Sequence, residues 1–149
     1  MPREKSHTGV AMNATLLYRI ATFLFVVTAL GHTYAILSPP PPSSEARAVY
    51  DSMNNVRFHL GGRNRSYGGV YRGLGLSVTV SMLFSAFLSW QLGELAHPAP
   101  SAVRALGWAF FAVQLAGVAL SFLYFHLPAI VLSALLAVIV GLAAWLAGS

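Results

Sequence analysis

The residues of this chain that could do acid–base or binding chemistry are few, and most of them lie close together in the sequence. An imidazole can accept and donate a proton near neutral pH, and guanidinium and phenol groups can hydrogen-bond to an oxygen that carries negative charge. We expect one catalytic candidate, His32, and five ligand-binding candidates: Arg57, His59, Arg65, Tyr67 and Tyr71. Together they predict a site for an acidic or oxygen-bearing molecule.

The same inventory excludes several kinds of catalytic site. The 149 residues contain no cysteine, which excludes disulfide bonds, thiolate metal sites and cysteine nucleophiles. No apolar stretch has the carboxylate cluster of a di-iron site, and His126 ends its stretch whereas His32 is set deeper, which does not suit a bis-histidine haem. No serine has a nucleophile-elbow pattern, and no strand pattern precedes the paired glycines. We therefore expect neither a metal nor a cofactor.

The elements that must position these residues follow from the composition. Hydrophobic residues make up 56% of the chain and charged residues only 9%, whereas a soluble domain is roughly a quarter charged. A helix needs about 20 mainly apolar residues to cross a bilayer, and four stretches meet this need: 16–37, 74–92, 105–125 and 129–147. The chain is predicted to be an all-α integral membrane four-helix bundle, a single domain over 1–149. The net charge of +5 favours a lipid surface rather than a nucleic acid as partner.

The segment 38–72 is much longer than a connection between two spans needs to be. Pro39 to Pro42 predict a stiff polyproline spacer. Ser43-Ser44-Glu45 then indicates a helix start, and Gly61-Gly62 indicates the end of that helix. Because the apolar residues between them recur at helical spacing, we expect an amphipathic interfacial helix over about 44–60 that lies on the membrane surface or caps the bundle.

Topology places most of the polar residues on one side of the membrane, because the end of the first span and the segment 38–72 share that side. His32 lies about five residues before the end of its span, hence about 7–8 Å below the interface. An ionisable group at this depth is a functional candidate; the alternative is a neutral histidine hydrogen-bonded to a neighbouring helix or to the loop. Arg57 falls within the apolar stripe of the interfacial helix, so it could bind a lipid headgroup or an acidic ligand, or snorkel. Residues 63–72 are expected to form a structured loop.

Contacts between the spans are predicted to use small residues, because helices in a membrane associate by close packing rather than by hydrophobicity. The second span has a small residue at every fourth position: Gly73, Ser77, Ser81, Ser85, Ser89 and Gly93. Gln114 in the third span must find a partner, since an unsatisfied polar group in hydrocarbon is costly, and Ser81 or Ser85 is the expected one. Residues 1–13 are expected to be a frayed tail, and Arg19 to snorkel to the headgroups.

The orientation of the chain depends on which basic residues act as topology signals. The segment 38–72 has five arginines, and counting alone would place it in the cytoplasm. If those arginines are held in a site, the cluster of Arg3, Lys5 and Arg19 before the first span decides instead. We therefore expect the N-terminus in the cytoplasm and the long segment outside.

A further set of motifs runs from the end of the first span to the end of the second. They are Gly31-His32, Met53-Asn54-Asn55-Val56-Arg57-Phe58, Gly61, Arg65-Ser66-Tyr67, Tyr71, Gly73-Leu74-Gly75-Leu76 and Trp90-Gln91-Leu92. The chain thereby resembles, over about Gly31 to Leu92, a family of small uncharacterised four-helix bacterial integral membrane proteins. Leu74 stands where that family tends to have an aromatic residue. The resemblance implies a multi-pass protein of the bacterial cytoplasmic membrane and brings no activity with it.

Two classes of function stay open. In the first, the protein binds a lipid-soluble or amphiphilic molecule at one membrane interface, or does acid–base chemistry on it, through His32, Arg57, Arg65, Tyr67 and Tyr71. In the second, it is a non-catalytic subunit or scaffold of a membrane complex that docks through the 38–72 loop. The expected partners are membrane lipids and, beyond them, a hydrophobic small molecule, a second copy of the chain or a larger membrane complex. The sequence leaves open whether the protein is an enzyme.

Overall fold

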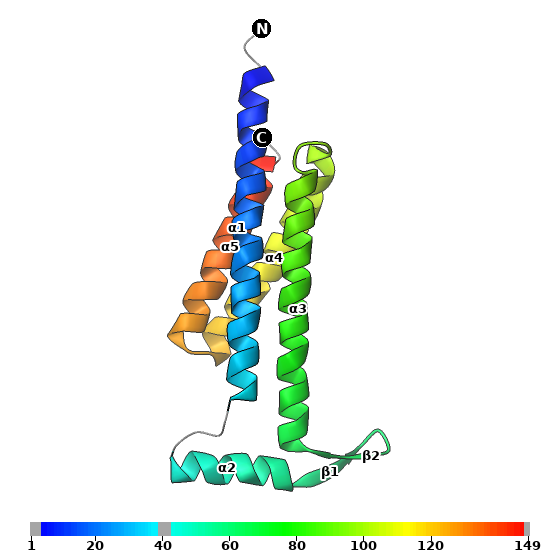
Figure 1. Ribbon diagram of the computed structural model, residues 1–149, viewed down its shortest axis with the longest axis vertical. Coiled ribbons are helices and arrows are strands. Elements are labelled where there is room, and N and C mark those ends of the chain that lie inside the picture. The colour runs from blue at the N-terminus through cyan, green and yellow to red at the C-terminus, as the bar shows by residue number, and fades with distance from the viewer. Residues whose placement is uncertain (1–3, 39–42, 148–149) are drawn as a thin grey trace. The chain divides into compact units, whose positions relative to one another are not determined.

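The computed structural model describes residues 4–38 and 43–147, with side chains described from Asn13 onward. Its elements follow the chain in this order (Figure 1): α1 (Glu4–Leu37), α2 (Ser44–Asn55), β1 (Arg57–Leu60), β2 (Arg63–Ser66), α3 (Tyr67–Leu95), α4 (Pro100–Tyr124) and α5 (Leu127–Ala147). Four helical stretches are long and apolar enough to cross a membrane: Asn13–Leu37, Tyr67–Leu95, Pro100–Tyr124 and Leu127–Ala147. The prediction of a helical chain with four long apolar helices is confirmed. The predicted polyproline spacer lies outside the described residues.

All four long helices begin earlier than the predicted spans, α1 and α3 by the most residues. α1 starts at Glu4, so the expectation of a frayed tail over 1–13 is wrong from residue 4 onward. α3 starts at Tyr67, because the Ser66 hydroxyl accepts the Gly69 N–H at 3.1 Å and caps the first turn. A prediction from hydropathy finds only the apolar part of a helix. It does not include the polar or glycine-rich turns at the helix ends.

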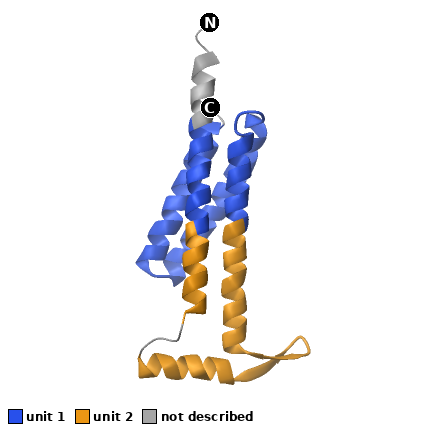
Figure 2. Ribbon diagram, in the orientation of Figure 1, with its two compact units in different colours: residues 1–26, 84–149 blue, residues 27–83 orange. Residues whose placement is uncertain are grey.

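The chain divides into two compact units (Figure 2). The first unit comprises Met1–Val26 and Phe84–Ser149, and the second comprises Val27–Leu83. Each unit contains one part of α1 and one part of α3. The single domain over 1–149 stays an expectation from the sequence.

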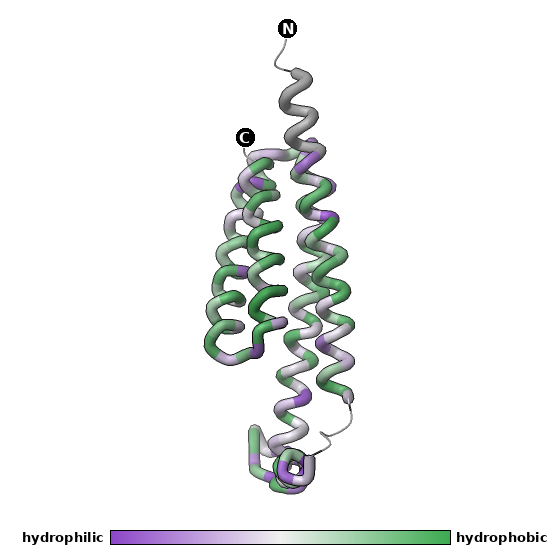
Figure 3. Tube along the Cα trace, turned by 90° about the vertical axis from the view of Figure 1, so that its left-hand side faces the viewer, coloured by the Kyte–Doolittle hydropathy of each residue, from purple (hydrophilic) through white to green (hydrophobic). Residues whose placement is uncertain are grey.

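The core of the first unit is built from all four of its helices. Its largest fully buried apolar side chains each come from a different helix: Tyr18 of α1, Leu92 of α3, Val103 of α4 and Val140 of α5. The rings of Phe25 and Phe110 join α1 to α4, with centroids 5.7 Å apart. Figure 3 shows that apolar residues dominate these helices. Since many large apolar side chains also cover the outer faces, the hydropathy of the helices does not arise from the core alone.

Small residues and hydroxyl groups bring α1 and α3 together in the first unit. Ser89 Oγ donates to Tyr18 O at 2.8 Å, and Thr15 Oγ1 donates to Gly93 O at 3.0 Å. A Cβ at position 93 would lie 3.3 Å from Tyr18 Cβ, a tight contact, so the close approach favours glycine there. The helix contact predicted for the small-residue stripe is thus confirmed at Ser89 and Gly93. In the second unit, by contrast, the exposed Ser77 hydroxyl bonds to the carbonyl one turn earlier in α3.

α4 and α5, joined by a very short link, form an antiparallel hairpin. A Cβ at Gly107 would lie 2.9 Å from Ala144 Cβ, and a Cβ at Gly141 would lie 2.8 Å from the Phe111 ring. Pairing of position 107 with 144 and of 111 with 141 is the order of antiparallel helices. Glycine at both positions lets the two backbones approach closely, as expected for helices that associate in a membrane.

The second unit corrects the predicted interfacial helix over 44–60. α2 ends at Asn55, and β1 and β2 form an antiparallel pair around Gly61 and Gly62. The φ angles of these glycines are +56° and +75°, and a tight two-residue hairpin turn with both central residues at positive φ favours glycine. The glycine pair therefore closes a hairpin and does not end a helix. Arg57 lies on a strand, so its predicted place in an apolar helical stripe is wrong.

Tyr18 and Gly107 provide a test of packing in the first unit. The Tyr18 hydroxyl is buried, has no hydrogen-bond partner among the described residues, and would be met by a Cβ at position 107. We predict that Gly107→Ala lowers the free energy of unfolding by about 1–3 kcal/mol, the usual cost of overpacking a core. Equilibrium unfolding in detergent measures this change.

Gly117→Ala, on the same helix, is the matched control, because nothing lies within 4 Å of a Cβ at that position. It should leave the unfolding free energy unchanged or raise it by about 0.5–1 kcal/mol through better helix propensity. Tyr18→Phe removes the hydroxyl and should restore part of the stability lost in Gly107→Ala. Equal effects of the two glycine substitutions would contradict this packing.

Candidate ligand-binding site

The hairpin and the first turn of α3 form an open cavity of about 350 Å³. Its lining combines two guanidinium groups, an amide and a hydroxyl with apolar side chains: Arg57, Leu60, Asn64, Arg65, Ser66, Gly69 and Val70. Both arginines are exposed, and neither forms a hydrogen bond or ion pair with any described residue. A guanidinium fork matches the geometry of a carboxylate or phosphate, so the cavity is suited to an anion.

The strand register places the two arginines in neighbouring cross-strand pairs, Arg57 on the face of Ser66 and Arg65 on the face of Phe58. Arg57 pairs with Ser66, and Phe58 pairs with Arg65. These two cross-strand pairs are the ones nearest to the start of α3. The Phe58 ring packs against the Tyr67 ring with centroids 4.4 Å apart, which fixes β1 to the first turn of that helix. Tyr67 therefore ties the hairpin to α3 and is not itself a lining residue of the cavity.

A second set of contacts fixes α2 against the start of α3. Arg72 Nη2 donates to Asn54 Oδ1 at 2.9 Å and to the Tyr50 hydroxyl at 3.4 Å. Gly68 is buried at the same place, where a Cβ would lie 2.9 Å from Asn54 Cγ. The structured loop predicted over 63–72 is therefore β2 and the first turns of α3. Arg72 stabilises this scaffold and does not line the cavity.

His32 lies outside the cavity. Its Nδ1 is 3.1 Å from Thr79 Oγ1, across the contact between α1 and α3. Thr79 follows Gly69 by roughly ten residues, which is about 15 Å along a helix. The histidine thus has the hydrogen bond to a neighbouring helix that one of the two sequence interpretations expected, and it does not share a ligand pocket with the arginines.

The remaining candidates are placed in different ways. Tyr67 packs on the hairpin, as described above. His59 and Tyr71 are exposed and form no hydrogen bond or ring contact with the residues that the structure describes. Of the six predicted site residues, Arg57 and Arg65 thus line one cavity, and Tyr67 packs against Phe58 of the same hairpin.

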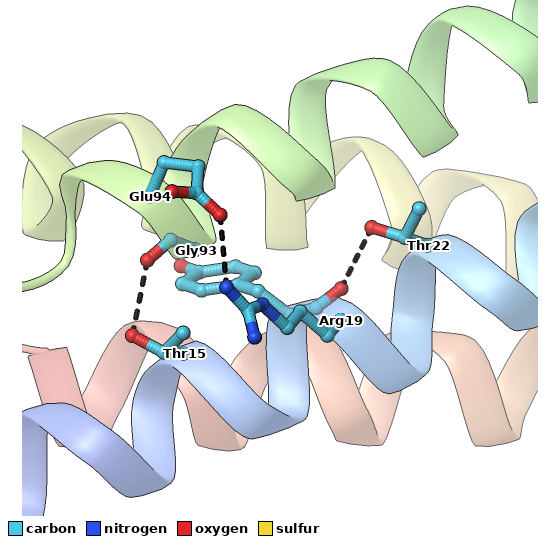
Figure 4. Close-up of polar contacts among 6 residues, drawn as sticks. Thr15, Arg19, Thr22, Gly93 and Glu94 are labelled. Atoms are coloured by element: carbon cyan, nitrogen blue, oxygen red, sulfur yellow. Dashed lines mark hydrogen bonds and ion pairs between the residues drawn. The ribbon is translucent and has the colours of Figure 1, made fainter.

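The first unit contains a polar cluster that the sequence did not reveal (Figure 4). Arg19 Nη2 donates to Glu94 Oε1 at 3.0 Å, and Arg19 Cζ lies 5.4 Å from the centroid of the Trp90 ring. Beside it, the Thr15 hydroxyl points toward the carbonyl of Gly93. Arg19, which was expected to snorkel, therefore has a partner. One signal for this ion pair was available in the sequence: antiparallel first and second spans place the start of one beside the end of the other, and so Arg19 near Glu94. Both charged side chains are about half exposed, so the pair contributes only about 0–1 kcal/mol.

Gln114 and the possible metal ligands are the remaining polar residues considered in the sequence. Gln114 is half-buried. No described residue of its own unit forms a hydrogen bond with it, so the predicted bond to a serine is not seen there. In the described ranges 4–38 and 43–147, no three side chains of His, Asp or Glu gather in a way that could hold a metal ion.

No family model, curated protein or solved structure matches this chain. The resemblance to four-helix bacterial membrane proteins therefore stays an expectation. Evidence for the function therefore comes from the geometry of this chain.

The role of Arg72 as a scaffold residue can be measured. Arg72→Met keeps an apolar stem and removes the hydrogen bonds to Asn54 and Tyr50. We predict that amide hydrogen exchange in α2 becomes about fivefold faster, because a net contribution of about 1 kcal/mol is lost. Arg63→Met is the control, since Arg63 is exposed on β2 and bonds to no other described side chain. Equal exchange in the two variants would show that Arg72 does not hold α2.

Proposed function

We propose that this chain is a multi-pass membrane protein that binds the anionic headgroup of an amphiphile at one membrane interface. The single observation that carries the proposal is the cavity of the hairpin, which has both Arg57 and Arg65 among its lining residues. It lies at the start of α3, one of the four helices long and apolar enough to cross a membrane.

The chemistry of the lining favours a negatively charged group. No carboxylate lines the cavity, so the charges of the two arginines are not offset there. The Asn64 amide and the Ser66 hydroxyl add hydrogen-bonding groups, although the Ser66 oxygen already accepts from Gly69 N–H. A phosphate or carboxylate would receive charge-assisted hydrogen bonds from the two forks.

The surroundings of the cavity favour an amphiphile over a free anion. Leu60 and Val70 line it together with the arginines, and Leu74, one turn beyond Val70, is exposed on α3. A headgroup held by the arginines would therefore place its hydrocarbon part beside the apolar start of a membrane span. Lipid recognition by basic residues close to a span follows the same physical rule.

The proposed location is the bacterial cytoplasmic membrane, with the N-terminus in the cytoplasm. α2 would lie on the outer surface of the membrane as an amphipathic interfacial helix. The exposed Val49, and Val56 directly after the helix, would face the lipid. Arg57 and Arg65 line the cavity and Arg72 is bonded to Asn54 and Tyr50, which supports discounting these three arginines as topology signals. The basic residues before the first span then set the orientation.

A binding experiment with matched arginine variants tests this function. The probe is phosphatidylglycerol, offered to the purified protein in mixed micelles and compared with phosphatidylcholine by native mass spectrometry. Because a basic residue near a lipid surface contributes about 1 kcal/mol, Arg57→Gln and Arg65→Gln should each weaken phosphatidylglycerol binding about fivefold, and the double variant about 25-fold. Arg47→Gln, on α2 and outside the cavity lining, should change binding less than twofold.

Two results would contradict the proposal. The first is equal binding of the anionic and the zwitterionic lipid by the wild-type protein. The second is an equal loss in all three single variants, which would indicate a diffuse basic surface. If the double variant kept its lipid but lost a co-purifying membrane subunit, the scaffold role of the 38–72 segment would be favoured instead.

A further inference from the structure

The helical hairpin of α4 and α5 has an open groove of about 440 Å³, which we call the α4–α5 groove. Along α4 it extends from Trp108 to Val118, and along α5 from Trp145 to Ala134. All of its lining residues are apolar, apart from the N–H groups of the two indoles. Its volume is in the range of ligand pockets, about 300–1,000 Å³. The groove is therefore large enough for a ligand, and its lining suits hydrocarbon.

The depth of the groove comes from a difference in side-chain size. Among its lining residues Ala137 is buried and Gly141 is half-buried, whereas the larger Leu115 is exposed. The Phe111 ring packs over Gly141, because a Cβ at position 141 would lie 2.8 Å from that ring. Trp108 meets Phe111 edge-on, with ring centroids 5.5 Å apart. These contacts hold the aromatic end of the groove in place without a ligand.

The length of the groove favours an acyl chain over a partner helix. Trp108 and Val118 are separated by roughly ten residues, which is about 15 Å along a helix. The hydrocarbon core of a bilayer is about 30 Å thick, so the groove matches one leaflet. A helix of a second copy or of another subunit would cross both leaflets, and its contact surface would continue beyond the groove. An acyl chain occupies one leaflet only.

Arg104 provides a positive charge at the end of the groove where a headgroup would lie. It precedes Trp108 by four residues, so the two side chains share one side of α4. Arg104 is exposed and forms no hydrogen bond or ion pair with any described residue. The other Lys, Arg, Asp or Glu side chains described in the first unit are Arg19 and Glu94, which pair with each other. Arg104 is thus the unpaired charge among these three, and it complements an anion.

The two indoles lie between Arg104 and the purely apolar part of the groove. Tryptophan favours the boundary between hydrocarbon and headgroups, because its body is apolar and its N–H is a hydrogen-bond donor. Neither Trp108 nor Trp145 uses this N–H in a hydrogen bond to a residue that the structure describes. Both donors are therefore available to the ester oxygens of a lipid whose chain lies in the groove.

We propose that the α4–α5 groove binds one anionic phospholipid, with an acyl chain along the groove and the headgroup at Arg104. Burial of the chain supplies affinity, and the guanidinium selects for negative charge. The groove lies in the first unit and shares no residue with the cavity lined by Arg57 and Arg65. The inference rests on the membrane location proposed above, but not on lipid binding by those two arginines.

Tryptophan fluorescence with brominated lipids tests the site, because bromine quenches an indole that it contacts. Trp90→Phe removes the third tryptophan of the chain, so Trp108 and Trp145 report alone in this background. The probes are phosphatidylglycerol and phosphatidylcholine with brominated acyl chains, offered to the purified full chain in detergent micelles. Half-maximal quenching should need about fivefold less of the phosphatidylglycerol, the effect of one basic residue near an anionic lipid surface.

Variants in this background separate the charge from the groove. Arg104→Gln should reduce the difference between the two lipids to less than twofold, and since Arg104 is exposed, this reading does not depend on core packing. Ala134→Phe fills the inner end of the groove and should weaken quenching by brominated phosphatidylglycerol several-fold. Val113→Phe is the matched control, because Val113 is exposed on α4 and does not line the groove. The double variant Arg57→Gln/Arg65→Gln should quench as the parent protein does.

Several results would overturn the inference. Equal quenching by the two lipids in the parent protein would indicate ordinary contact with the surrounding lipid. A preference that survives Arg104→Gln would place the selecting charge elsewhere, and equal quenching in Ala134→Phe and Val113→Phe would place the chain outside the groove. Absence of quenching by either lipid would indicate that a second copy or another helix covers the groove. Loss of the preference in the double variant of Arg57 and Arg65 would show that the two sites are not separate, whereas its persistence distinguishes failure of one proposal from failure of the other.

Discussion

The pairing of α1 with α3 depends on side-chain hydroxyl groups that bond to backbone carbonyl oxygens of the facing helix. Ser89 donates to Tyr18 O at 2.8 Å and Thr15 to Gly93 O at 3.0 Å. A buried polar group that is left without a partner is costly. The hydroxyls therefore favour a short distance between the two helices, and small residues allow it. The rest of the structure builds on the helix pair that results.

The second unit uses the same pairing to position its polar residues. There, Thr79 of α3 contacts both His32 and Thr33 of α1, and a Cβ at Gly75 would lie 2.9 Å from Ile36 Cγ1. The start of α3 is thereby held beside α1, and the hairpin is attached to that start through stacked rings. The two exposed arginines of the cavity are thus positioned by the hairpin, and the hairpin is positioned by the contacts between α1 and α3.

Local signals in the sequence were sufficient for the four apolar helices, since each depends on the composition of one contiguous stretch. The hairpin was missed because Gly61 and Gly62 are ambiguous. Glycine with positive φ serves both the C-terminal end of a helix and a two-residue strand turn, and the apolar spacing before the pair favoured the helix. The alternation in Arg57-Phe58-His59-Leu60 was the signal for a strand, but four residues carry little statistical weight.

The candidate site was predictable in part for a similar reason. The arginines were singled out because a basic segment in a charge-poor chain stands out by composition, and they do line one cavity. Which arginine is free and which is bonded depends on the fold: Arg72 meets Asn54 across a large sequence separation. The partner of His32, Thr79, likewise lies on another helix. Such nonlocal contacts cannot be read from spacing along one chain.

The central claim is that the arginine cavity holds an anionic headgroup, and a carbon–phosphorus distance measurement tests it most directly. Solid-state NMR on the protein in membranes that contain phosphatidylglycerol, with the guanidinium carbons labelled, detects which arginines lie within a few ångströms of lipid phosphorus. The account predicts strong coupling to phosphorus for Arg57 and Arg65 and weak coupling for Arg72, whose guanidinium is bonded to Asn54. Uniformly weak coupling at Arg57 and Arg65, or coupling that is strongest at Arg72, would contradict it.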